Sequence, residues 1–373
     1  MGNFQNQQKL KIFLMIYIFY SSIHSKCRCN GEEKNEKIAN FVFGDSIVDV
    51  GNNNYILSLS KANYVPNGID FGMPTGRFTN GRTIVDIIGH ELGLGAFPPP
   101  YLAPTTKGSV ILQGVNYASG AGGILNETGV LFGGRLNMDA QLDNFANTRQ
   151  DMVDMIGEEE AMKVLNKALY SVTMGSNDFI NNYLTPGFSK LEQHLVTPQA
   201  FINSMIDKFR LQLTRLYNMG ARKIVVVNIG PIGCIPYQRD INPTAGNDCV
   251  AFPNQLAQAF NTELKTLVNH LRTDLPDSIF VYADSYRVFT HLLDNYQSYG
   301  FENGDSACCY GSGRFGGLIP CGPTSKLCYD RSKYVFWDPY HPSDAANLVI
   351  AKRLIDGDTN DISPINFRQL VNS

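Results

Sequence analysis

Short apolar runs alternate with long segments of helical periodicity through most of this chain, and this alternation constrains the fold more than any other feature. The run Arg222-Lys-Ile-Val-Val-Val-Asn228 is almost continuously β-branched. Runs of this kind are typical of strands buried on both faces of a parallel sheet. Comparable runs occupy 39–43, 168–174 and 279–283. Helical segments between them predict repeated βαβ units, and therefore an α/β fold with a central parallel sheet flanked by helices.

The remaining pattern gives approximate bounds for the other elements. Helices are expected over 83–92, within 139–167, and over 201–218, 256–272 and 342–356, the last with Pro342 in its first turn. The Gly- and Pro-rich stretch 95–134 is expected to form loops with one short strand at 109–113. The sequence has no internal repeat and no evident linker. We therefore expect one domain over 26–373, with its core at about 38–360.

Composition and charge exclude several classes of protein. Charged residues make up 17% of the chain and aromatic residues 11%, which excludes a disordered chain and a long coiled coil. The formal charge is −3, so the chain lacks the basic surface with which nucleic-acid-binding proteins neutralise phosphates.

The N-terminus has the pattern of a secretory signal peptide. Residues 1–25 contain Lys9 and Lys11 but no acidic residue, and the apolar run 12–20 is followed by small and polar residues. This run is too short for the roughly 20 apolar residues of a membrane-spanning helix. Cleavage is expected after Ser25, which predicts a secreted protein without a transmembrane or lipid anchor.

Eight cysteines are consistent with an oxidising compartment. Cys27 and Cys29 lie beside the expected cleavage site, and the sequence has no Cys-x-x-Cys pair and no His-Glu-x-x-His helix, so disulfides are favoured over a metal site. The other six are disulfide candidates: Cys234, Cys249, Cys308, Cys309, Cys321 and Cys328. Short loops favour pairing the first two, and pairing the adjacent Cys308 and Cys309 with Cys321 and Cys328 in either order. Asn126 begins the one Asn-x-Ser/Thr sequon and is a predicted glycosylation site.

Two strands are followed directly by polar residues at a glycine turn. Gly44-Asp45-Ser46 follows the first strand, and Gly175-Ser176-Asn177-Asp178 follows the strand that ends near residue 174. Ligands of open parallel sheets bind beyond the carboxyl ends of the strands. Ser46 is therefore a candidate nucleophile whose own N–H helps to hold an oxyanion. The structural alternative is that Ser46 and Asn177 only cap turns.

A serine nucleophile needs a base, and His341 is the best candidate. It lies in Phe336-Trp-Asp-Pro-Tyr-His-Pro342, where Asp338 is close enough to bind its second ring nitrogen. His90, His194, His270 and His291 fall within or near helical segments and are expected to be structural or surface residues. The alternative is that Trp337 and the two prolines merely form a rigid turn. The Gly-x-Ser-x-Gly elbow of α/β-hydrolases does not surround Ser46.

Taken together, these motifs resemble the GDSL esterases and lipases, or SGNH hydrolases, and in particular their secreted plant branch. The resemblance covers nearly the whole mature chain and rests on seven motifs in the family's order, at 41–54, 75–82, 115–120, 175–178, 228–234, 308–309 and 337–342. It implies a flavodoxin-like three-layer α/β/α domain without a metal or an organic cofactor. One departure is Ile47 in place of the leucine of the name-giving tetrapeptide.

The resemblance also implies roles for individual residues. The nucleophile is Ser46, and Asp338 and His341 form the acid–base pair. The oxyanion donors are the Ser46 backbone, the Asn177 side chain and a glycine after Ala118-Ser119. That glycine is assigned to Gly120, with Gly122 as the alternative. As in the plant branch, the protein is expected outside the cell, in the apoplast or cell wall.

The leading hypothesis is a secreted serine hydrolase that cleaves acyl lipids or related plant esters through an acyl-enzyme on Ser46. Alternatives are a carbohydrate O-acetylesterase, an acyltransferase with the same triad, and a catalytically silent lipid- or glycan-binding protein. A binding protein has no need of all four residues Ser46, Asn177, Asp338 and His341. The expected partner is a small-molecule or lipid ester, with no nucleic acid and no obligate protein partner. Loops 95–134 and 180–200 are expected to distinguish a lipid pocket from a glycan pocket.

Overall fold

The computed structural model describes residues 38–185 and 196–373. The predicted signal peptide, Cys27, Cys29 and His194 lie outside the described residues. None of the described helices combines the length and the apolar character that crossing a membrane requires.

Four parallel strands form the centre of the molecule, as the alternating pattern predicts. They are β1 (Asn40–Gly44), β2 (Leu169–Thr173), β3 (Lys223–Val227) and β4 (Ile279–Ala283), hydrogen-bonded in that order. A short strand that the pattern did not reveal, β9 (Ile362–Ser363), pairs antiparallel with β4. The central strands are buried almost throughout, which explains their continuous apolar sequence.

The prediction of a strand at 109–113 is wrong. Residues Gly108–Gln113 form a 3₁₀ helix, η2, and most of them are exposed. The following segment, 115–119, lies along β1 instead. Val42 N–H donates to Val115 O at 3.0 Å, Tyr117 N–H donates to Val42 O at 2.7 Å, and the bridge is parallel. If this segment is counted as a strand, the order of the parallel strands across the sheet is 2-1-3-4-5, which is the flavodoxin-like arrangement. The strand order, not the strand direction, reverses between β1 and β2.

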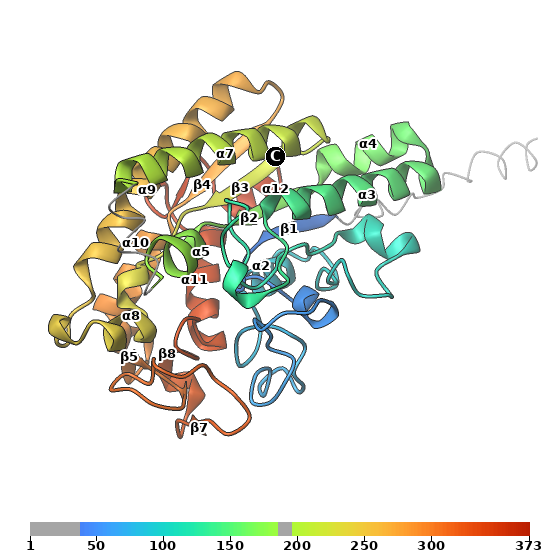
Figure 1. The fold of residues 1–373 in the computed structure, drawn as a ribbon. Helices are drawn as coiled ribbons and strands as arrows, with labels where there is room; N and C mark the ends of the chain where they lie inside the picture. Colours follow the sequence, from blue (N-terminus) through green and yellow to red (C-terminus); the bar gives the residue numbers. More distant parts are fainter. Residues whose placement is uncertain (1–37, 186–195) are drawn as a thin grey trace, which may run out of the picture. The chain divides into compact units, whose positions relative to one another are not determined.

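Side chains alternate across β1, so its two faces are covered by different helices. Phe41 and Phe43 pack on Phe145, with ring centroids 5.3 and 5.6 Å apart, whereas Val42 points the other way and clusters with Val85. One helical layer contains α3 (Met138–Ile156), α4 (Glu158–Lys167), α7 (Pro198–Asn218) and α9 (Ala251–Asp274). The other contains α2 (Ile84–Glu91), α10 (Ser285–Asp294), α11 (Asp344–Asp356) and α12 (Phe367–Val371). The three-layer α/β/α fold is thereby confirmed (Figure 1).

The predicted helices are present, with local differences. The pattern over 139–167 is two helices, separated by Gly157 at φ +83°, a conformation that favours glycine. Thr83 caps α2 in a capping box with Asp86. Ser343 caps α11, so Pro342 precedes that helix and does not belong to its first turn.

Shorter elements connect the layers. The short helices are η1 (Asn52–Tyr55), η3 (Val130–Phe132), α5 (Ser176–Asp178), the π-helix η4 (Phe179–Tyr183), η5 (Ile232–Cys234), α8 (Pro236–Ile241), η6 (Pro243–Ala245), η7 (Tyr296–Tyr299) and η8 (Arg331–Lys333). The short strands are β5 (Asn303–Ala307), β6 (Cys309–Tyr310), β7 (Lys326–Leu327) and β8 (Tyr334–Phe336).

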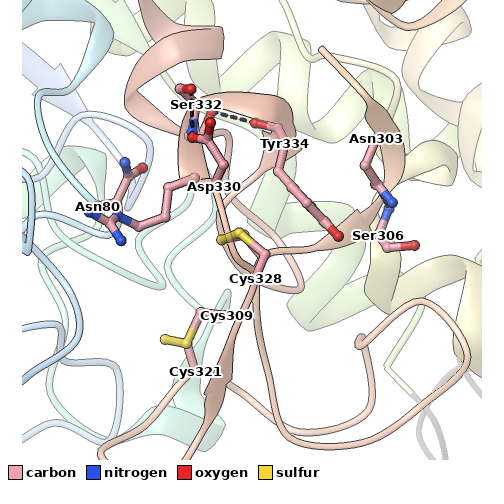
Figure 2. The surroundings of a disulfide bond; sticks show 12 residues. Asn80, Asn303, Ser306, Cys309, Cys321, Cys328, Asp330, Ser332 and Tyr334 are labelled. Carbon is pink, nitrogen blue, oxygen red and sulfur yellow. Dashed lines mark hydrogen bonds between the residues drawn. A yellow bond between two sulfur atoms is a disulfide. The ribbon is translucent and has the colours of Figure 1, made fainter.

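All six disulfide candidates are paired. Cys234 bonds to Cys249 as expected, and the order left open by the sequence is Cys308–Cys328 and Cys309–Cys321. Figure 2 shows Cys309 bonded to Cys321 below Cys328 and the turn at Asp330. The two neighbouring bridges fix the loop after β6 against the segment that leads to Asp338.

Candidate active site

Ser46, His341 and Asp338 form a continuous hydrogen-bonded chain. His341 Nε2 lies 2.8 Å from Ser46 Oγ, and His341 Nδ1 lies 2.9 and 2.8 Å from the two carboxylate oxygens of Asp338. Ser46 and His341 are 295 positions apart in the sequence. This arrangement has the geometry of a serine hydrolase triad.

A tight turn places Ser46 at the carboxyl end of β1. Asp45 N–H donates to Thr173 O on β2, and the carbonyl of Asp45 accepts the N–H groups of Val48 and Asp49. A Cβ on Gly44 would lie 2.6 Å from Thr173 O and 2.5 Å from Val48 Cγ2. Glycine at this position therefore lets the chain bend at the strand end and direct Ser46 into the crevice.

The turn 336–342 is held rigidly by hydrogen bonds and burial. Trp337 is fully buried, its indole N–H donates to Asn67 Oδ1 at 2.9 Å, and its backbone N–H donates to His341 O. Asp338 Oδ1 also accepts the backbone N–H groups of Tyr340 and His341, each at 2.8 Å. These backbone hydrogen bonds hold the carboxylate in place independently of the imidazole. The turn can therefore be both a rigid structural turn and the part of the chain that positions Asp338 beside His341.

The motif at 75–82 packs against the imidazole ring of His341. Arg77 forms a buried, bidentate ion pair with Asp86 at 2.7 and 2.9 Å, which holds the motif against α2. Phe78 then packs on the imidazole of His341, with ring centroids 5.2 Å apart. Sequence reasoning assigned this motif to the family resemblance alone, and its contact with the base was not predicted.

The contacts of Gly120 do not support its assignment as an oxyanion donor. Its N–H donates to the buried carboxylate of Asp49 at 3.0 Å, and a Cβ at this position would lie 2.7 Å from Phe78 and Ser60. Gly120 is therefore required for close packing. The alternative, Gly122, donates its N–H to Ser119 O.

Ala121, between these glycines, has the free amide. It lines the pocket around Ser46 and has φ +67°, a conformation unusual for a residue with a side chain. Among the described residues, no acceptor binds the N–H of Ala121 or of Ser46. A glycine pattern points to the neighbours of Ala121, which is why sequence reasoning missed it.

Asn177 is held in one orientation. Its Nδ2 donates to Gly122 O at 2.9 Å, and its Oδ1 accepts from Asn181 Nδ2 at 2.6 Å. These contacts leave one Nδ2 hydrogen for the pocket, which Asn177 lines together with Ser46. Asp178 anchors the opposing loop by accepting the N–H groups of Ile124 and Leu125, each at 2.9 Å.

Three carboxyl groups around the site are fully buried. Burial raises the pKa of Asp45 to about 7, and raises the pKa of both Asp49 and Asp178 to about 6. Hydrogen bonds from backbone N–H groups oppose this effect in all three. Asp49 joins the two loops of the site, because it accepts Gly51 N–H and Gly120 N–H at 2.7 and 3.0 Å.

The triad residues and Asn177 line a pocket of about 230 Å³. Further polar residues, such as Lys61 and Asn228, also line it, but most of the wall is apolar. Apolar lining comes from Ile47, Leu59, Phe78, Ile84, Phe132, Ile180, Val227, Ile232, Ile235, Phe289, Phe336 and Ile350. No group of three or more His, Cys, Asp or Glu side chains suited to a metal ion occurs in 38–185 or 196–373.

The other predicted positions lie away from this pocket. His90, His270 and His291 are on α2, α9 and α10, where all three are exposed. Asn126 is exposed, whereas the Thr128 of its sequon is buried and donates its hydroxyl to Asp178.

Comparison with known proteins agrees with this geometry. Residues 41–354 match the family described as GDSL-like lipase/acylhydrolase. Three Arabidopsis thaliana proteins, each named a GDSL esterase/lipase, are similar over almost their whole length. They are 65%, 51% and 50% identical to this chain over 90%, 96% and 96% of it, which corresponds to 91%, 95% and 97% of the relatives. The chain therefore belongs to the GDSL-like lipase/acylhydrolase family, and it is a carboxylic ester hydrolase.

Proposed function

We propose that the chain hydrolyses acyl esters through a covalent intermediate on Ser46, with His341 as general base. The observation that carries the proposal is the 2.8 Å contact between His341 Nε2 and Ser46 Oγ. His341 takes the hydroxyl proton as Oγ attacks the ester carbonyl, and then gives that proton to the departing alcohol. Water, deprotonated by the same imidazole, releases the acid and restores Ser46. Asp338 fixes the imidazole tautomer and stabilises the imidazolium.

Three donors are proposed to hold the negative charge of the tetrahedral intermediate. They are the N–H groups of Ser46 and Ala121 and the free Nδ2 hydrogen of Asn177. All three residues line the same pocket, and the two backbone groups have no acceptor among the described residues. Donors positioned before the reaction stabilise the oxyanion without reorganisation.

Acyl lipids are the substrates that the pocket supports best. Ile47, Ile232 and Phe336 line the pocket that contains Ser46, and Leu59 and Phe132 belong to the same apolar wall. The side chain of Leu59 is 82% exposed, so the apolar surface continues out of the pocket. Loop 95–134 supplies Ala121 and Phe132 to this wall, as expected of a lipid pocket and not of a polar glycan pocket.

Secretion is part of the proposal. It is supported by the signal-peptide pattern of residues 1–25 and by the three disulfides. A single catalytic domain over 26–373 with a glycan on Asn126 completes the proposed mature protein. The exposure of Asn126 supports glycosylation there.

An alkyl p-nitrophenyl phosphonate tests the proposed nucleophile. Attack by an activated serine displaces p-nitrophenol and leaves a stable phosphonyl ester. We expect one adduct per molecule and its location on the peptide that contains Ser46, measured by intact-mass and peptide mass spectrometry, with loss of esterase activity in proportion. Ser46→Ala should remain unlabelled. Labelling of that variant, or of another residue in the wild type with full inactivation, would contradict the proposal.

Removal of the Asn177 amide tests the oxyanion site. We expect Asn177→Ala to lower kcat by about 100- to 1000-fold with a small change in KM, because the lost donor acts mainly in the transition state. Asn181→Ala is the comparison, since it keeps the Asn177 amide but removes the side chain that orients it, which also lines the pocket, and it should cost less. Steady-state kinetics on p-nitrophenyl butyrate measures both. Equal losses in the two variants would indicate that Asn177 serves only to hold the loop.

A further inference from the structure

The pocket around Ser46 has an inner end that the proposed reaction leaves unassigned. Its inner wall contains Ile84 from α2, Val227 from the end of β3, Phe289 from α10 and Ile350 from α11. These residues extend from the carboxyl ends of the strands into the layer formed by α2, α10 and α11. The pocket is therefore partly internal, between the sheet and one helical layer.

A second, smaller cavity lies directly behind this wall. Its volume is about 20 Å³, and five of its lining residues also line the main pocket: Ile84, Thr173, Val227, Ser285 and Ile350. Its remaining lining is Val48, Val85, Ile88, Ser171, Leu354 and Phe367. The shared side chains are thus a partition between two largely apolar spaces.

The partition has little polar character to offer a ligand. The Ser285 hydroxyl is already used, because it donates to the backbone carbonyl of Asn228 at 2.6 Å. Ile350 is 2% exposed, lies in the middle of α11 and contributes only hydrocarbon. Thr173 is the one other polar residue of the partition, so a ligand that enters this end of the pocket gains stability mainly by burying apolar surface.

We infer that the acyl chain of the substrate runs inward from Ser46 into this inner end, and that Ile350 closes it and limits the acyl length. The inference rests on the proposed acylation of Ser46, because that bond fixes where the chain begins. A linear hydrocarbon matches the apolar chemistry of this inner end. The second cavity is then unused space that a smaller residue at position 350 joins to the pocket.

The test measures kcat/KM for p-nitrophenyl esters from C2 to C16 with wild type, Ile350→Ala and Ile350→Phe. Ile350→Ala removes three carbon atoms at the partition, so we expect the optimum to move to chains longer by about two to four carbons. The kcat/KM ratio of the longer ester to the C2 ester should rise by about tenfold or more, the effect of one or two methylenes in an apolar pocket. Ile350→Phe should shift the optimum to shorter chains.

Ile355→Ala is the matched control. Ile355 is on the same helix, is 1% exposed and lines neither space, so its truncation weakens the core without enlarging the pocket. Its chain-length profile should equal that of wild type. If Ile350→Ala does not fold, Ile350→Val makes the same test with a smaller expected shift in the same direction.

The outcomes separate this inference from the proposed function. Equal rates for wild type and Ser46→Ala would overturn the proposed nucleophile, and with it this inference. An active wild type, an inactive Ser46→Ala and unchanged profiles in both Ile350→Ala and Ile350→Phe would overturn the acyl assignment alone. In that case, a profile that responds to Ile350 only when the alcohol length is varied would assign the inner end to the alcohol.

Discussion

Replacing either Ser46 or His341 by alanine is expected to lower kcat for p-nitrophenyl butyrate by about 10⁴- to 10⁶-fold. The two side chains act in one proton transfer, since His341 Nε2 and Ser46 Oγ are 2.8 Å apart. Without the imidazole the hydroxyl is a poor nucleophile, and without the hydroxyl the imidazole has no attacking group to activate. The double variant should therefore be no slower than the slower single variant.

Steady-state kinetics of the four proteins measures this non-additivity, and circular dichroism checks that each variant is folded. Residual activity above the uncatalysed rate is expected in all three variants, because Asn177 and the free backbone N–H groups remain. His90→Ala, on the exposed surface of α2, is the control and should equal wild type. Losses that multiply in the double variant would mean that Ser46 and His341 work in separate steps.

Sequence periodicity predicted the layers of the fold because the central strands are buried on both faces. Their apolar character, and the glycine at or just after the ends of β1 and β2, follow from local requirements that one segment displays by itself. Residues 109–113 show the limit of this reasoning. Their apolar side chains are typical of a strand, but the edge of β1 is occupied by 115–119, which leaves the earlier segment exposed as a 3₁₀ helix. Which of the two segments pairs with the edge of β1 depends on tertiary contacts, and the local sequence pattern does not show these contacts.

The residues of the candidate site could be predicted where a motif contains the proposed reacting side chain itself. Ser46, Asn177, Asp338 and His341 were identified from short motifs, and the structure brings Ser46, Asp338 and His341 into contact. The Ala121 amide was not predictable, since any residue has an N–H group. Its availability depends on Asp49 taking the N–H of Gly120 and on Ser119 taking that of Gly122. The contact with Asp49 joins residues 71 positions apart, and glycine spacing does not reveal it.

Asp338→Asn is expected to lower kcat by about 10⁴-fold while the protein stays folded. The asparagine oxygen can still accept the two backbone N–H groups that Asp338 Oδ1 binds, so the turn should keep its shape. Its NH₂ group would then face His341 Nδ1 and donate to it. The neutral imidazole would carry its proton on Nε2, pointing at Ser46 Oγ, and it would be unable to accept the hydroxyl proton.

Kinetics with p-nitrophenyl butyrate and a thermal melt distinguish this effect from simple unfolding. For Asp338→Asn we expect KM within about threefold of wild type and a melting temperature within about 3 °C, because the loss concerns one proton and not the pocket. Asp338→Ala is the comparison. It leaves the N–H groups of Tyr340 and His341 without their acceptor, and should lower the melting temperature as well as kcat. A rate within tenfold of wild type in Asp338→Asn would show that the imidazole tautomer is set by another group.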